Sequence, residues 1–316
     1  MHISILIPTY NRTGQLAEAI ASIAAQDLSL IDEVLVGDNS NTEMREANRA
    51  MIAASAIAGL IRHLPNDPPT DNFRNQWSLA RQARCDHVLF LHDDDHLCPG
   101  GLALLAGACA GETDPRVKVW FGRNYLMDAE GRIDMEATRA KDREYGKDGS
   151  GEARPIWRWC LKYSLPPNSA LMDRTSYIRN MEGPRDGNVG DWGLWVRFAN
   201  SGAWARFVPE YVSSWREQPV QQTSSGRGMD SHRAYELGLQ LKVQPESEPQ
   251  KAELLSNLAR VATLRYLRDG ERDLAMKCFA SPHWTWRQRL SPRGIATALM
   301  FVLPRPIWLW ALHHRA

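Results

Sequence analysis

At residues 87–97 the chain reads His-Val-Leu-Phe-Leu-His-Asp-Asp-Asp-His-Leu, an apolar run followed almost at once by three acids. Residues 88–91 are uninterrupted apolar residues, which is typical of a strand buried on both faces of a parallel sheet. Asp93, Asp94 and Asp95 repel each other unless a cation or a proton compensates their charge. Ligands of open α/β sheets bind beyond the carboxyl ends of the strands. We therefore expect a hard cation, Mg²⁺ or Mn²⁺, at this position, with a solvated acidic turn as the alternative.

Apolar runs elsewhere in the chain alternate with stretches of helical spacing. We expect strands at 3–7, 33–36, 60–64, 117–127, 168–172 and 203–208, and helices at 13–26, 43–58, 72–84, 100–110 and 175–181. This alternation predicts an α/β fold with a mostly parallel sheet flanked by helices. The polar segments 138–154 and 217–229 are expected to be loops, and the second could close on a ligand.

Composition narrows the class of protein. The 316 residues are 43% hydrophobic and 24% charged, as in ordinary globular proteins. A net charge of +1 argues against nucleic-acid binding, which normally requires a basic excess. The five cysteines include no Cys-x-x-Cys pair, and this favours reduced thiols in the cytoplasm. The first residues lack a basic segment and a cleavage site, so we expect no signal peptide.

Three of the expected strands end in polar segments. The first leads into Pro8-Thr-Tyr-Asn-Arg12, the second into Asp38-Asn-Ser40, and the fourth into the Asp93–Asp95 triplet. Because parallel strands have their carboxyl ends at the same edge of a sheet, these segments should converge. A nucleotide diphosphate sugar needs contacts to its base and ribose and a metal for its diphosphate, and the three segments offer both.

The sequence resembles the family 2 glycosyltransferases, which have the GT-A fold. Four segments carry the resemblance, in the order of the family and over roughly residues 3–215: Ser4-Ile-Leu-Ile-Pro-Thr-Tyr-Asn-Arg12, Glu33-Val-Leu-Val-Gly-Asp-Asn-Ser40, Phe90-Leu-His-Asp-Asp-Asp95 and Gly190-Asp-Trp-Gly-Leu-Trp-Val-Arg197. The resemblance implies an inverting transfer of a sugar from a nucleotide diphosphate donor to a hydroxyl. The acceptor would be a saccharide or a lipid-linked saccharide, as in surface polysaccharide synthesis.

The resemblance also implies which residues would bind the nucleotide. The nucleoside pocket would be lined by Pro8, Thr9, Tyr10 and Arg12. Asp38 would hydrogen-bond the base, most often uracil, so a UDP-sugar is the favoured donor. Asp93 would contact the ribose. Asp38 could instead only cap a turn, since Asp side chains often bond the backbone two residues on.

The metal and the catalytic base follow from the same resemblance. Asp94 would be the principal ligand of Mn²⁺ or Mg²⁺, with Asp95 beside it. Asp191 would be the general base that deprotonates the acceptor, although it could merely be an acid favoured at a helix N-terminus. Arg197 and Arg216 are possible contacts to the diphosphate or the acceptor.

The chain departs from the family pattern at three positions. His92 and Gly190 stand where many relatives have Asp and Glu. Gln218 stands where many relatives have a His that follows the last core strand, and either Gln218 or His232 would have to replace it.

Two other readings of the chain stay open. A sugar-phosphate nucleotidyltransferase is disfavoured because the first strand does not lead into a Gly-rich phosphate loop. An inactive carbohydrate-binding protein of the same fold is disfavoured by the intact acids.

The C-terminal part differs from the rest of the chain. We expect a glycosyltransferase domain over 1–228 and a helical extension over 229–316. After Asp273 the extension has basic residues and no acidic ones, and it carries Trp308 and Trp310 among aliphatic residues. This pattern suits a segment lying on the inner face of the cytoplasmic membrane, although a helix packed on the domain or in a homo-oligomer is the alternative.

Overall fold

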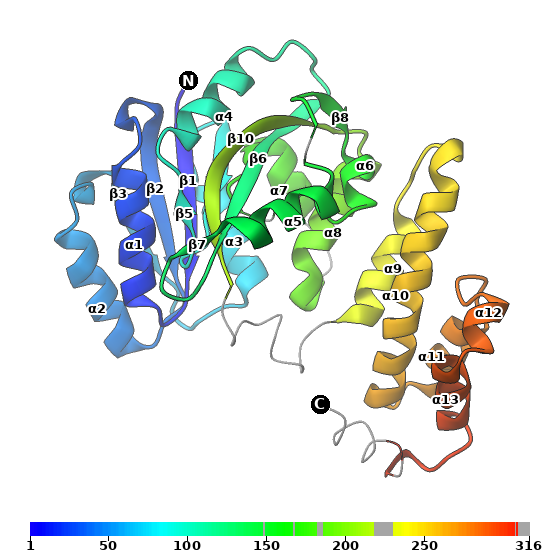
Figure 1. The fold of residues 1–316 in the computed structure, drawn as a ribbon. Helices are drawn as coiled ribbons and strands as arrows, with labels where there is room; N and C mark the ends of the chain where they lie inside the picture. The colour runs from blue at the N-terminus through cyan, green and yellow to red at the C-terminus, as the bar shows by residue number, and fades with distance from the viewer. Residues whose placement is uncertain (148, 167, 182–185, 218–229, 307, 309–316) are drawn as a thin grey trace. The chain divides into compact units, whose positions relative to one another are not determined.

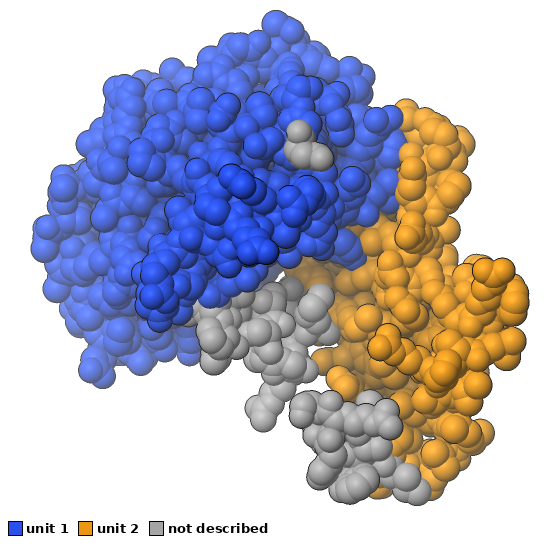
Figure 2. All heavy atoms as spheres, viewed as in Figure 1, with its two compact units in different colours: residues 1–185, 197–221 blue, residues 186–196, 222–316 orange. Residues whose placement is uncertain are grey.

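The computed structural model describes residues 1–316 except 148, 167, 182–185, 218–229, 307 and 309–316. The chain divides into two compact units (Figure 2). The first unit comprises residues 1–185 and 197–221, and the second comprises residues 186–196 and 222–316. The expected domain boundary between 228 and 229 lies outside the described residues, as does most of the expected loop 217–229.

A large, mostly parallel sheet forms the middle of the first unit (Figure 1). Its order is β3-β2-β1-β4-β9-β6-β10-β5, while β7 pairs with β6 and β8 with β10. The pairs β1–β2, β2–β3, β1–β4 and β6–β10 are parallel, and the remaining pairs are antiparallel. The strands are β1 Ile3–Thr9, β2 Ile31–Asp38, β3 Ile61–Pro65, β4 His87–Phe90, β5 His96–Leu97, β6 Val117–Met127, β7 Ile133–Asp134, β8 Ala153–Pro155, β9 Leu171–Asp173 and β10 Trp204–Arg216.

Helices accompany this sheet, as the sequence predicts for an α/β fold. They are α1 Thr13–Ala24, α2 Thr42–Ala53, α3 Asn72–Gln82, α4 Gly101–Ala110, α5 Met135–Tyr145, α6 Ile156–Cys160 and α7 Arg174–Met181. α8, Gly190–Asn200, has residues in both units. Short 3₁₀ turns lie at Leu28–Leu30, Ala58–Leu60, Gly187–Val189 and Pro245–Ser247.

The central strand β1 is buried on both of its faces. Ile3, Ile5 and Ile7 belong to one core cluster, which also holds apolar residues of α1 and α4. Leu6, which points to the other face because strand side chains alternate, is also fully buried. On that face α3 contacts β1 and β2. The unbroken apolar sequence of β1 therefore follows from its position between two layers of helices.

The prediction of a loop over residues 138–154 is wrong for most of this segment. Residues 135–145 form α5, and β8 begins at Ala153. The Asp134 side chain accepts a hydrogen bond of 2.9 Å from the Ala137 amide, and Gly146 ends the helix in the left-handed conformation, with a φ of 65°. The residues between these caps have good helix propensity, so polarity was a poor indicator of a loop here.

The second unit is helical, as expected for the C-terminal part. Its helices are α9 Ser231–Gln240, α10 Glu248–Asp269, α11 Arg272–Ala280, α12 Trp286–Arg289 and α13 Pro292–Met300. Its core cluster joins side chains of α9, α10 and α11 to Trp284, Phe301 and Trp308. Trp308 is only 5% exposed, so the prediction that its side chain lies on the surface is wrong. Trp310 lies outside the described residues.

Candidate active site

The ends of β1, β2 and β4 meet at the carboxyl edge of the sheet, as the sequence predicts. Thr9, the last residue of β1, is in register with Asp38, the last residue of β2. On the other side of β1, Leu6 is in register with Phe90, the end of β4. The loops that follow β1 and β2 are also joined, because the Asn11 amide donates to Ser40 Oγ at 2.8 Å.

Asp93 ties the acid triplet to the end of β1. Its Oδ2 accepts hydrogen bonds from Thr9 Oγ1 at 2.8 Å and from the Tyr10 amide at 3.3 Å. Burial raises the pKa of this carboxyl group, while the nearby Arg12 guanidinium and the Thr9 hydroxyl act in the opposite direction. Asp93 thus fixes the loop after β1 against the loop after β4.

Arg12 links two of the three acids. Its Nη1 lies 3.2 Å from Asp93 Oδ1 and 2.7 Å from Asp94 Oδ2. A positive charge between two carboxylates reduces the repulsion that the triplet would otherwise suffer. We define the acid cluster as Asp93, Asp94 and Asp95 together with Arg12, which is also one of the residues predicted for the nucleoside pocket.

Asp95 is buried and ties two more segments to the cluster. Its Oδ1 accepts a hydrogen bond of 2.8 Å from the Arg216 amide at the end of β10. Its Oδ2 accepts a hydrogen bond from Asn168 Nδ2, in the segment before β9. Burial raises the pKa of the Asp95 carboxyl group, although hydrogen bonding with His92 opposes the shift.

The Arg216 side chain is buried beneath the cluster. Its Nε donates to the Asp94 carbonyl at 2.9 Å and its Nη1 to the Ala129 carbonyl at 2.7 Å. Its Nη2 contacts Glu18 and His96. With these contacts Arg216 holds the acid-bearing loop in place, and its predicted contact with the diphosphate or the acceptor stays a prediction.

A group that could hold a metal ion lies in this cluster. Ligand atoms of His92, Asp94 and Asp95 all lie within 4.8 Å of one another. An ionised carboxylate has about four acceptor sites, so Asp95 keeps the capacity to bind an ion beside its contacts with Arg216, Asn168 and His92. One imidazole and two carboxylates therefore fit a divalent cation. The sequence did not single out His92 as a ligand, although its position just before the triplet was the available signal.

Asp38 is 0% exposed, and its carboxylate is bonded to protein groups. Oδ1 accepts from the Ser40 amide at 2.8 Å, while Oδ2 lies 2.8 Å from Asn48 Nδ2 and 2.9 Å from His63 Nε2. Burial alone would raise the pKa of Asp38, but hydrogen bonds from His63, Asn48 and Ser40 lower it to about 2. The structure therefore shows the turn-capping contact, and a contact of Asp38 with the base stays a prediction.

Pro8 and Tyr10 lie on either side of Thr9 and differ in burial. Pro8 is buried within β1, whereas the Tyr10 side chain is 62% exposed. Of the side chains predicted for the nucleoside pocket, Tyr10 offers an accessible ring next to the acid cluster.

Four predicted site residues remain: Asp191, Arg197, Gln218 and His232. Asp191 is exposed in the first turn of α8, and His232 lies in α9; both belong to the second unit. Arg197 is in the first unit, where its Nε donates to the Asn180 carbonyl. Gln218 lies outside the described residues. The roles of these four residues stay predictions.

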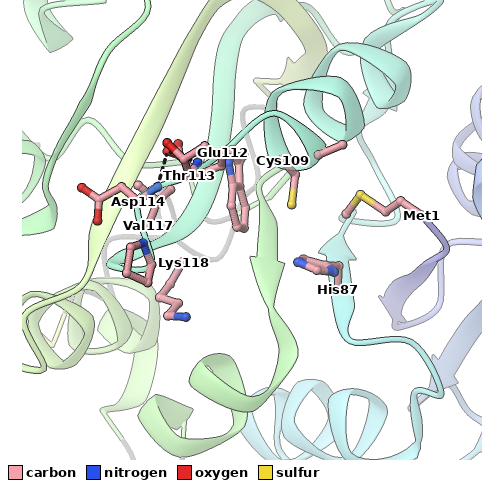
Figure 3. A pocket seen from close by; sticks show the side chains of 11 residues that line it. Met1, His87, Cys109, Glu112, Thr113, Asp114, Val117 and Lys118 are labelled. Carbon is pink, nitrogen blue, oxygen red and sulfur yellow. Dashed lines mark hydrogen bonds between the residues drawn. The ribbon is translucent and has the colours of Figure 1, made fainter.

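One pocket of the first unit lies at the opposite edge of the sheet. It has a volume of about 500 Å³, and Figure 3 shows the side chains of Met1, His87 and Cys109 around it. His87 and Val117, which also line it, are the first residues of β4 and β6. This pocket is therefore at the amino ends of the strands, away from the acid cluster, and contributes nothing to the candidate site.

Residues 4–114, which hold β1 to β4 and the acid cluster, match the family model described as glycosyl transferase family 2. An uncharacterized protein of Mycobacterium tuberculosis is 28% identical over 151 residues, which cover 46% of this chain and 45% of that protein. The GalNAc(5)-diNAcBac-PP-undecaprenol beta-1,3-glucosyltransferase of Campylobacter jejuni is 30% identical over 135 residues, covering 42% of this chain and 41% of that enzyme. The chain thus matches less than half the length of these two relatives.

Solved structures show the same fold over most of the chain. The crystal structure of S. aureus TarS residues 1–349 in complex with UDP-GlcNAc has a TM-score of 0.59 at 14% identity, covering 91% of this chain and 92% of that one. The complex of the same TarS segment with UDP has a TM-score of 0.55 at 16% identity, covering 92% and 93%. The predicted resemblance to family 2 glycosyltransferases is confirmed over residues 4–114, and the predicted GT-A fold is confirmed; the fourth segment, residues 190–197, lies outside the family match.

Proposed function

We propose that this chain is an inverting glycosyltransferase that moves a sugar from a nucleotide diphosphate donor, with a UDP-sugar favoured, to a hydroxyl group. The observation that carries the proposal is the convergence of Thr9, Arg12 and the Asp93–Asp95 triplet at the carboxyl edge of one sheet. The family match over residues 4–114 supports the class of reaction. The TarS complexes with UDP-GlcNAc and UDP support the class of donor.

The diphosphate would lie at the acid cluster. His92, Asp94 and Asp95 would hold a divalent cation, Mn²⁺ or Mg²⁺, there. When bound, the ion supplies positive charge that stabilises the departing diphosphate. An imidazole among the ligands favours Mn²⁺, because Mg²⁺ is normally held by oxygen atoms and water.

The nucleoside would lie on the loop that follows β1. Tyr10 offers an exposed ring on which a base can stack. Thr9 and the Tyr10 amide are fixed by Asp93, so this loop is held in place before the donor binds. Pro8 and Arg12 complete the proposed lining.

Asp191 is the proposed general base. It would accept the proton of the acceptor hydroxyl as that oxygen attacks the anomeric carbon, and the bond from that carbon to the diphosphate would break in the same step. The anomeric configuration is then inverted. Its position in the first turn of α8 supports this role, because a helix N-terminus favours the ionised carboxylate.

The proposed acceptor is a saccharide or a lipid-linked saccharide, and the proposed location is the cytoplasm and the inner face of its membrane. The name of the Campylobacter relative includes an undecaprenol-linked saccharide, which supports this class of acceptor. Within the described part of the chain, no helix combines the length and the apolar character needed to cross a bilayer.

Calorimetry with UDP, with and without Mn²⁺, tests the proposal. The wild-type chain should bind UDP more tightly with Mn²⁺, and Asp94→Asn should lose most of this increment. Glu46→Gln is the matched control, since Glu46 is an exposed acid on α2 that forms a surface ion pair with Arg49. Undiminished Mn²⁺-dependent binding to Asp94→Asn would contradict the assignment, and absence of UDP binding to the wild type would contradict the proposed donor.

A further inference from the structure

α13 presents an apolar face to solvent. Ile295 and Leu299 are four residues apart, which places them on one side of α13, and Val302 follows in the turn after the helix ends. They are 50%, 50% and 74% exposed. Gly294 and Thr297, by contrast, are buried. The helix therefore packs through Gly294, Thr297 and the partly buried Met300, and it leaves Ile295 and Leu299 outside.

α12 adds two further apolar side chains beside this helix. Trp286 is 66% exposed and Leu290 is 67% exposed. The two helices are packed closely, since a Cβ atom at Gly294 would lie 2.1 Å from the Gln288 carbonyl oxygen. We define the α12–α13 apolar face as the side chains of Trp286, Leu290, Ile295, Leu299 and Val302. Exposed apolar side chains gathered in this way usually mark an interaction surface.

The segment that carries this face has charges of a single sign. Residues 274–306 contain no acidic residue and five basic ones: Lys277, Arg287, Arg289, Arg293 and Arg305. Arg287 and Arg293 are exposed within the two helices themselves. A second copy of the face would oppose these arginines with like charges, which disfavours self-association. An anionic surface with an apolar interior complements both the charge and the side chains.

We propose that the α12–α13 apolar face docks on an anionic lipid bilayer. The five apolar side chains would enter the boundary between headgroups and acyl chains, with Arg287 and Arg293 at the level of the phosphates, as in helices that lie in the plane of a membrane. The inference rests on the proposed function, because a lipid-linked acceptor lies at such a surface. It moves the membrane contact from Trp308, which is buried, to α12 and α13.

Sedimentation of the full chain with vesicles tests this surface. The vesicles contain equal parts of phosphatidylglycerol and phosphatidylcholine, and phosphatidylcholine alone serves as the neutral comparison. The double variant Ile295→Glu, Leu299→Glu should reduce the partition coefficient by roughly 100-fold, about tenfold for each side chain withdrawn from the bilayer. Arg287→Gln and Arg293→Gln should each reduce binding to the anionic vesicles about fivefold.

The matched control is the double variant Leu239→Glu, Val261→Glu. Both residues are exposed apolar residues of the second unit, on α9 and α10, so the charge added is the same. Thermal melting checks that each variant is folded. Equal loss in the control and in the α12–α13 variant, or no binding by the wild type, would overturn the proposal. A lipid-free wild-type dimer that the α12–α13 variant converts to a monomer would assign the face to self-association and overturn it too.

UDP binding in the presence of Mn²⁺ is measured on the same proteins. Intact UDP binding with no vesicle binding would refute the surface and leave the proposed function standing. Vesicle binding without UDP binding would support the membrane-docking surface and refute the proposed function.

Discussion

The stability of this chain should depend on pH through one buried lysine. Lys147 is buried, and its Nζ contacts Asn124 Oδ1 at 3.1 Å and the Gly122 carbonyl at 3.5 Å. Burial lowers its pKa from 10.5 to about 8, with Asp142 opposing and Arg123 reinforcing the shift. Between these two values the unfolded chain binds more protons than the folded chain, so the free energy of unfolding rises with pH. At about 1.36 kcal/mol per pH unit, the full gain is roughly 3 kcal/mol.

Urea unfolding of the wild type and of Lys147→Met at pH 7 and at pH 10 measures this gain. Titration of other groups affects both proteins, so the difference between them isolates Lys147. We expect the wild type to gain about 2–3 kcal/mol relative to the variant as the pH rises. Lys162→Met is the control, because Lys162 is exposed and its removal should leave the pH dependence unchanged. Parallel pH profiles for the wild type and Lys147→Met would refute the reasoning.

Two further predictions concern the candidate site. The Asp191→Asn variant should keep its affinity for UDP with Mn²⁺. Its turnover should fall by roughly 10²–10⁴-fold, because this is the usual contribution of a general base. Equal turnover in the wild type and the variant would mean that the base lies elsewhere. Asp95→Ala leaves the Arg216 amide and the Asn168 side chain without their buried acceptor, which should lower the free energy of unfolding by about 2–6 kcal/mol. The control for this urea titration is Asp67→Ala, at a side chain that is 86% exposed. A loss of stability in Asp95→Ala no larger than in the control would show that the contacts of Asp95 do not stabilise the fold.

The parts of the fold that could be predicted from the sequence are those where local pattern and tertiary packing agree. β1 and β4 are apolar runs because both of their faces are buried, and their carboxyl ends meet because they are parallel. The acid triplet could be placed for the same reason. Helix α5 could not be predicted from the sequence, because its polar residues have the composition of a loop and only the two caps identify it as a helix.

The contacts inside the site needed the three-dimensional structure. Nothing in the local sequence indicates that Asp38 is enclosed by Asn48 and His63, because these partners come from α2 and β3. The same holds for Arg216, whose partners are spread from residue 18 to residue 129. Trp308 was placed at the surface because its neighbours resemble a membrane segment, yet it fills the core of the second unit.

The alternation of side chains along β1 limits how this chain can change in length. Ile3, Ile5 and Ile7 face one helical layer and Leu6 the other, and the same register sets Thr9 at hydrogen-bonding distance from Asp93. One residue inserted into or deleted from β1 would exchange the two faces and carry Thr9 away from its partner. Substitutions that change side-chain volume are a far milder perturbation. Insertions and deletions among homologous chains should therefore avoid residues 3–9 and accumulate in the surface loops.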